Sequence, residues 1–165
     1  MRFIFLYLLL SLTVISNGQL VSEKVETSTY IGKVKSNSSI LASLEYRLDD
    51  NKDTIYTLKY RNFKLSNLLE YETFTFKNDG NTINQFYDIL KSFFTEENKK
   101  NKEYQVAVKF RDKSLYLFNW RNLGVTNVGI SLSRYNIVDN SIDSGYCYLT
   151  EKQINKLFSR EDNND

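Results

Sequence analysis

The fold is decided by a stretch in which two runs of alternating apolar and polar residues flank a polar turn: ILASLEYRLDDNKDTIYTLKY, residues 40–60. In the first run every second residue from Ile40 to Leu48 is apolar, and the alternation returns at Tyr56 beyond positions 49–53. A period of two is typical of a strand with one buried face, and Asp and Asn favour turns. Residues 40–60 therefore predict an antiparallel β-hairpin.

The same alternation continues on both sides of this hairpin. Before it, residues 27–35 predict a first strand. After it, further strands are predicted at residues 71–77, 104–110, 115–120, 128–132 and 145–149. With the two strands of the hairpin, this makes eight.

Two segments follow a helical period instead. From Thr82 the apolar residues recur at helical spacing, at Ile83, Phe86, Tyr87, Leu90, Phe93 and Phe94. Thr82 and Gln85 have the T-x-x-Q spacing of a capping box, and Thr150 and Gln153 repeat it before a second, shorter helix. The element order is then ββββα-ββββα. Strands in runs predict an antiparallel α+β fold with the helices packed on one side.

A weak internal echo supports the interpretation of this order as a degenerate duplication. Its members lie sixty positions apart: Tyr56, Tyr60, Arg61, Asn62 and Asn67 in the first half, and Tyr116, Trp120, Arg121, Asn122 and Asn127 in the second. Because tyrosine and asparagine are common in this chain, chance is the competing explanation.

The N-terminus reads as a secretory signal peptide. Residues 1–18 hold one cation, Arg2, then an apolar run and a small or polar end, with the cut expected after Gly18. The run is too short for a membrane span, although an uncleaved anchor is the alternative. We expect residues 19–160 to form a single globular α+β domain in the periplasm or outside the cell, and residues 161–165 to be a frayed polar tail.

Composition excludes several classes of protein. The 165 residues include no histidine, which removes Ser-His-Asp and Cys-His catalysis, and with a single cysteine the usual zinc sites are also excluded. Neither G-x-G-x-x-G nor G-x-x-x-x-G-K-[ST] occurs. We therefore expect no metal and no cofactor. Without residues 1–18 the net charge falls from +2 to +1, and this near-neutral balance argues against nucleic acid as a partner. Cys147, flanked by tyrosines in a strand-like run, is expected in the core rather than in a bridge between chains.

The strand that holds Tyr116, Phe118 and Trp120 is the most suggestive surface, and its register decides which way the rings face. A loop at positions 112–113 pairs the rings with Lys109, Ala107 and Gln105 and makes a ligand face. A loop that also includes Ser114 pairs them with Phe110, Val108 and Val106 and makes them core. Patterning favours the second register, because it gathers the large apolar residues on one side.

Paired carboxylates offer the one route to an enzyme. Glu70 and Glu72 are expected on one face of a strand, at a spacing that glycoside hydrolysis can use. Phe74 and Phe76 continue that face and could raise the pKa of one acid by burial. The competing interpretation is that the two glutamates keep a sheet edge soluble.

The favoured hypothesis is a secreted or periplasmic binding domain without enzymatic activity. Its unknown extracytoplasmic ligand or protein partner would contact the sheet face or loops near Tyr116, Trp120, Arg121, Tyr60 and Arg61. After signal cleavage no membrane-spanning segment is expected. The alternatives are a glycosidase-like hydrolase using Glu70 and Glu72, and a structural component of the cell envelope.

Overall fold

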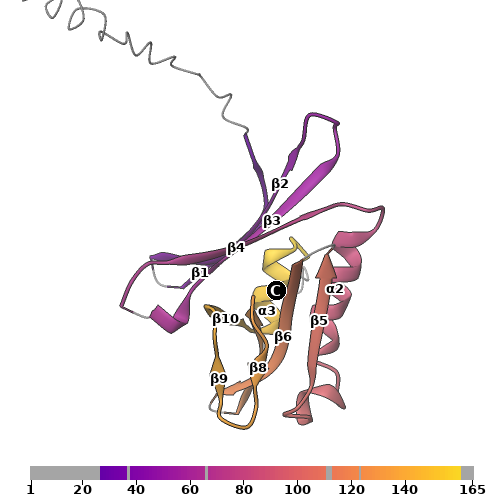
Figure 1. Cartoon of the computed structure of the whole chain (residues 1–165). Coiled ribbons are helices and arrows are strands. Elements are labelled where there is room, and N and C mark those ends of the chain that lie inside the picture. The colour runs from indigo at the N-terminus through magenta and orange to yellow at the C-terminus, as the bar shows by residue number, and fades with distance from the viewer. Residues whose placement is uncertain (1–26, 37, 66, 111–112, 123, 161–165) are drawn as a thin grey trace, which may run out of the picture.

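The computed structural model describes residues 27–36, 38–65, 67–110, 113–122 and 124–160. The predicted signal peptide, residues 1–18, and the predicted tail, residues 161–165, lie outside this part of the chain. The described part forms two four-stranded antiparallel sheets, one two-stranded sheet and two α-helices (Figure 1). The predicted α+β class and the order ββββα-ββββα are confirmed.

The first sheet is a meander with the spatial order β1-β2-β3-β4. Its strands are β1 (Thr29–Ser36), β2 (Ser39–Leu48), β3 (Thr54–Arg61) and β4 (Tyr71–Lys77), and the 3-10 helix η1 (Phe63–Leu65) lies between β3 and β4. The chain turns between β2 and β3 because the Asp49 carboxylate accepts the backbone N–H groups of Asn51 at 3.0 Å and Asp53 at 2.8 Å. The predicted hairpin is confirmed, with Leu44 opposite Leu58.

The second sheet is also a meander, interrupted once, with the order β10-β7-β6-β5. Its strands are β5 (Gln105–Phe110), β6 (Lys113–Asn122), β7 (Val125–Ser131) and β10 (Tyr146–Leu149). Between β7 and β10 the chain forms a small hairpin of β8 (Tyr135–Asn136) and β9 (Ser141–Ile142). These two strands were not predicted, because two residues are too few to show a period.

The first helix, α2 (Thr82–Ser92), buries Phe86 and Leu90 on its packed face. Its N-cap is Asn81, and the cap forms no side-chain hydrogen bond. The Thr82 hydroxyl accepts the Asp79 N–H at 2.9 Å and so holds the preceding turn. The capping box predicted for Thr82 and Gln85 is therefore wrong. The chain then passes through the 3-10 helix η2 (Asn98–Lys100) to β5.

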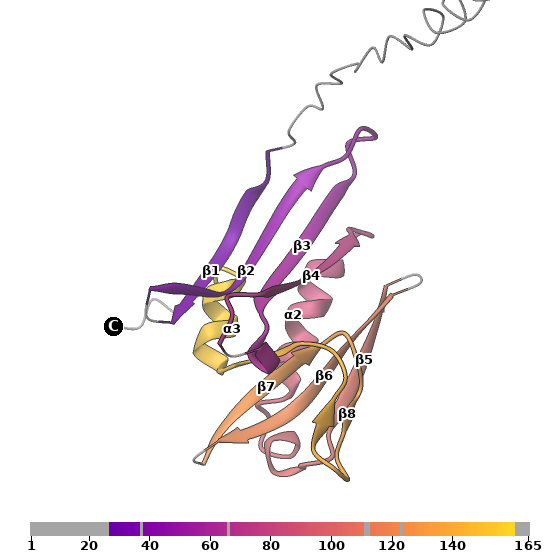
Figure 2. The ribbon, with the colours of Figure 1, turned by 60° about the vertical axis from the view of Figure 1, so that its left-hand side comes forward.

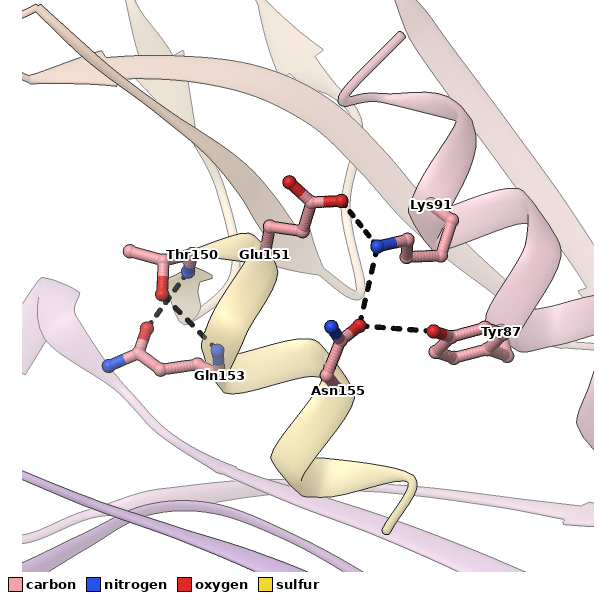
Figure 3. A network of polar contacts seen from close by, with 6 residues as sticks. All are labelled: Tyr87, Lys91, Thr150, Glu151, Gln153 and Asn155. Atoms are coloured by element: carbon pink, nitrogen blue, oxygen red, sulfur yellow. Dashed lines mark hydrogen bonds and ion pairs between the residues drawn. The ribbon is translucent and has the colours of Figure 1, made fainter. Parts of the chain in front are cut away.

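The second helix, α3 (Glu151–Leu157), begins at the predicted capping box, which is confirmed. The Thr150 side chain accepts the Gln153 N–H at 3.3 Å, and the Gln153 side chain accepts the Thr150 N–H at 2.8 Å (Figure 3). Such a reciprocal pair satisfies two N–H groups that a helix start otherwise leaves without partners. A helix of seven residues is marginal alone, so its packing against the rest of the molecule must stabilise it.

Polar contacts join the two helices to each other. The Tyr87 hydroxyl donates to the Asn155 side-chain oxygen at 3.0 Å, and Lys91 donates to the same oxygen at 3.4 Å and pairs with Glu151 (Figure 3). Tyr87 and Lys91 lie one turn apart on α2, so both face α3. The contacts fix the position of α3 along α2.

A single buried cluster contains side chains from both sheets and both helices. Figure 2 shows α2 and α3 behind the two sheets, on the side where the sheets bury their apolar residues. At the meeting point of the two halves, the ring of Phe76 in β4 stacks on that of Phe110 in β5 at 4.5 Å, and both rings contact Phe86 of α2 at 5.7 and 6.2 Å. The second meander is thereby packed against the first.

The two halves share a topology, a four-stranded meander followed by a helix, but the sequence echo does not follow it. Tyr56 and Tyr60 lie in β3, the third strand of the first meander, whereas Tyr116 and Trp120 lie in β6, the second strand of the other. The echo therefore joins positions that are not equivalent. The repeated topology stands without it.

Gly32 in β1 allows α3 to approach the first sheet closely. A Cβ atom at Gly32 would lie 2.3 Å from the Leu157 carbonyl oxygen and 2.4 Å from that of Lys156. These are backbone atoms of α3, which cannot rotate away as a side chain can. Any larger residue at position 32 must therefore push the helix off the sheet.

We predict that Gly32→Ala lowers the free energy of unfolding by about 2 kcal/mol, because the added methyl group overpacks the β1–α3 contact. Urea denaturation followed by circular dichroism measures the change. Ser36→Ala, at an exposed position of the same strand, is the matched control. Equal stability of the two variants would contradict the close packing described for Gly32.

Candidate functional site

The aromatic residues of β6 face away from the core shared by the two sheets. Phe110 pairs with Lys113, and Ala107 pairs with Tyr116, so the β5–β6 connection is residues 111–112. Both predicted registers are wrong, and the rings lie opposite to the face that the favoured register assigned. The physical reason is that β6 is apolar on both faces: Leu115 and Leu117 are fully buried in the main core, while the rings alternate with them.

The rings are covered by the small hairpin of β8 and β9. Phe118 is 1% exposed and stacks on Tyr135 of β8 at 4.8 Å, and Ile142 of β9 completes this second buried cluster. Gly129 lies against the Phe118 ring and leaves room for it, because a Cβ atom at position 129 would lie 2.2 Å from the ring. The outer face of the second sheet therefore holds a small core of its own.

Trp120 belongs to the same cluster. Its ring lies 6.2 Å from Tyr135, 5.9 Å from Tyr146 and 5.9 Å from Tyr148, on which it stacks with an angle of 10° between the planes. The indole is half-buried, and its neighbouring rings occupy much of its surface. This arrangement is typical of packing rather than of a ring kept open for a ligand.

The structure brings some predicted contact residues together and separates others. Trp120 and Arg61 lie at the two ends of one chain of contacts: Trp120 stacks on Tyr148, Tyr148 lies 4.8 Å from Phe63, and the Arg61 guanidinium lies 5.9 Å from the Phe63 ring. Tyr148 lies on β10, the outer strand of the second sheet, which contacts η1 and β3 of the first half.

The other three predicted residues do not join this surface. Tyr116 is half-buried on the covered face, and Arg121 is exposed near the end of β6 on the other face. Tyr60 is fully buried in the main core, where desolvation, with lesser effects from Cys147 and Glu72, raises its pKa far above its ordinary value. Tyr60 therefore has no surface to offer a ligand.

The two candidate carboxylates lie in different surroundings. Glu70 is exposed and precedes β4, and its backbone oxygen accepts the Asn62 N–H at 2.8 Å. Glu72 is half-buried, lies opposite Tyr60, and accepts the Asn62 side-chain amide at 3.5 Å. Neither lines the large groove described next. The hydrolase hypothesis stays a prediction.

A groove that the sequence analysis missed lies between β4, α2 and β5. Its volume is about 830 Å³, within the usual range for ligand sites. Phe76, Phe86 and Phe110 form part of its apolar lining, together with Ile89, Val106 and Val108. β4 is the outer strand of the first sheet and β5 is the outer strand of the second, so each borders the groove with an edge that pairs with no described strand. In Figure 1 β5 runs beside α2.

Charged residues surround the apolar lining of this groove. Lys77 pairs with Asp53, whereas Lys109 and Lys113 are exposed and form no ion pair with a described residue. Asp79 is the acid among the lining residues. The groove thus combines an aromatic floor with a mainly cationic rim.

No sequence signal could have placed the groove. The alternation of Phe74 and Phe76 predicts a buried strand face, but it does not say which strands will be outermost in their sheets. That information lies in the packing of one meander against the other. The helical pattern of α2 likewise shows an apolar face without showing that part of it stays open.

Among the described residues, no group of three or more His, Cys, Asp or Glu side chains could hold a metal ion. None of the helices in this part of the chain is long and apolar enough to cross a membrane. The chain matches no family model, no curated protein and no solved structure at a significant level.

Cys147 gives a direct test of the core around β10. Its side chain is fully buried, as predicted, and burial raises the pKa of its thiol far above the ordinary value. Because the thiolate is the reactive form, we predict that Ellman's reagent at pH 8 labels the native protein slowly, at a rate set by opening of the structure. In urea the labelling should be complete and fast. Rapid labelling of the folded protein would contradict the burial of Cys147.

Proposed function

We propose that this protein is a non-enzymatic binding domain that holds an extended segment of a partner protein in the β4–α2–β5 groove. The observation that carries the proposal is the position of the groove between two unpaired strand edges, above a floor of three phenylalanine rings. A strand edge offers backbone N–H and C=O groups to an added strand. Recognition by strand addition uses these groups for affinity and side-chain pockets for specificity.

The lining of the groove indicates the chemistry of the segment. Alternate side chains of an extended peptide point the same way, so apolar residues at every second position would reach the half-buried side chains of the lining, Ile89, Val106 and Phe110. The lysines at the rim, Lys109 and Lys113, favour acidic residues at the positions between. The preferred segment is therefore extended, apolar at alternate positions and acidic overall.

We propose that the protein acts in the periplasm or outside the cell. The support is the composition of residues 1–18, with one cation followed by an apolar run and a small-residue end. The buried single cysteine is compatible with such a place, since an inaccessible thiol does not form bridges between chains.

The proposal predicts which random peptides the folded protein selects. Peptides about ten residues long, enough to span β4 or β5, would be displayed as a library and selected on the protein. We expect enrichment of sequences with alternating apolar residues and a net negative charge. Nuclear magnetic resonance should then show the largest shifts in β4, β5 and α2.

A pair of matched variants tests the site. Ile89→Gln with Lys109→Glu changes one apolar and one cationic residue of the groove, and we expect the selected peptides to bind at least about tenfold more weakly. Val125→Gln with Lys102→Glu likewise changes one apolar and one cationic residue, at exposed positions outside the groove, and should leave binding unchanged. Equal affinities of the two variants, or no enrichment at all, would refute the groove as a peptide site.

A further inference from the structure

The outer strand of the second sheet, β5, has an edge that is open to pairing (Figure 2). The backbone N–H of Asn119 in β6 donates to the Tyr104 oxygen at 3.1 Å, in the register of the β5–β6 ladder. Because bonded and non-bonded pairs alternate in an antiparallel ladder, the N–H and C=O groups of residues 105, 107 and 109 point away from β6. In the described part of the chain no turn, loop or side chain bonds to these groups. They are available to another strand.

The sequence of this edge is nearly symmetric about its centre. Residues 104–110 read Tyr-Gln-Val-Ala-Val-Lys-Phe, with Ala107 in the middle, a valine on each side of it, then a polar residue and then an aromatic one. Such a strand is complementary to a second copy of itself that runs in the opposite direction. A two-fold axis at Ala107 places Val106 opposite Val108 of the second copy, and Gln105 opposite its Lys109.

The pairs formed across this axis are compatible with one another. Residues 105, 107 and 109 of one copy meet the same residues of the other, so their backbone groups pair in register. On one face the valines continue the apolar surface, since Val108 belongs to the main core and Val106 packs against it. On the other face the Gln105 side-chain oxygen can accept a hydrogen bond from the Lys109 ammonium. No like charges lie directly opposite each other, an arrangement that would be destabilising.

The edges of the other outer strands differ. β1 has two register irregularities, between Tyr30 and Gly32 and between Val34 and Lys35, which interrupt its row of backbone groups. β10 has four residues and contacts β3 and η1 of the first half. β4 has an exposed edge as well, and the experiments below distinguish it from β5.

We propose that this protein forms a symmetric dimer in which β5 pairs antiparallel with β5 of a second copy, about an axis at Ala107. The second sheets of the two copies then become one continuous sheet. Two-fold dimers are the commonest soluble homo-oligomers. The dimer does not depend on the proposed peptide function. One consequence does rest on that function: the dimer occupies the β5 edge of the β4–α2–β5 groove, so a second copy and a peptide paired with β5 exclude each other.

Disulfide trapping tests the register of the dimer. Ala107→Cys places two thiols directly opposite each other, with Cα atoms about 5.5 Å apart, a distance that a disulfide spans. Lys109→Cys is the matched control on the same strand, because its thiols would lie about 14 Å apart along the sheet. We expect Ala107→Cys to form linked dimers under mild oxidation at least about tenfold faster than Lys109→Cys, as measured by non-reducing electrophoresis. Equal rates would contradict the register.

Sedimentation velocity measures the dimer in the absence of any peptide. We expect the wild-type protein to dimerise at or below about 100 μM. Ala107→Pro removes an N–H that points away from β6, a position where an edge strand tolerates proline, and should weaken dimerisation at least about tenfold with an unchanged circular dichroism spectrum. Thr73→Pro, the matched control, removes an outward N–H from the exposed edge of β4 and should leave the dimer intact.

Three results of the sedimentation experiment would overturn the dimer. These are a wild-type protein that stays monomeric up to about 1 mM, a folded Ala107→Pro variant that dimerises as the wild type does, and loss of the dimer in a folded Thr73→Pro variant, which would place the pairing at β4. If Ala107→Pro does not fold, disulfide trapping decides. Addition of a peptide selected on the groove should shift the wild-type protein to monomer, and a peptide that binds the intact dimer would refute the exclusion but not the dimer.

Discussion

The contact of three phenylalanine rings holds this structure together. Phe76, Phe86 and Phe110 come from β4, α2 and β5, so the contact joins the last strand of the first meander to the first strand of the second through the helix between them. Aromatic rings bury large apolar areas and dominate the energetics of such contacts. The same rings form the floor of the β4–α2–β5 groove, so the binding surface we propose is a consequence of how the halves pack.

The second meander has apolar side chains on both of its faces, and both must be buried. This explains the added β8–β9 hairpin. One face of β6 is buried against the first sheet and the helices, and the other carries Tyr116, Phe118 and Trp120. The β8–β9 hairpin covers that second face with Tyr135 and Ile142. The ring-bearing face of β6 is thus mostly internal packing, while the β4–α2–β5 groove lies at two outer strands.

Local patterns predicted local structure well. The alternation in residues 40–60, the helical spacing from Ile83 and the capping box of Thr150 all appear in the fold, because each depends on neighbours close in sequence. The register of β5 and β6 was not predictable, since a strand that is apolar on both faces, such as β6, gives no preferred side. The cap of α2 was predicted one residue late, because the Thr82 hydroxyl binds Asp79 instead. The β4–α2–β5 groove arises from contacts between distant segments.

The central claim is that the two meanders depend on one another through the phenylalanine contact. Trp120, the single tryptophan, reports on the second sheet, whereas Phe76 lies in the first. In urea, Trp120 fluorescence and far-ultraviolet circular dichroism should change together in one transition. Phe76→Ala should shift both signals to lower urea, by about 3–5 kcal/mol in the free energy of unfolding. A Trp120 transition that Phe76→Ala leaves in place would show that the second sheet folds by itself and would contradict this account.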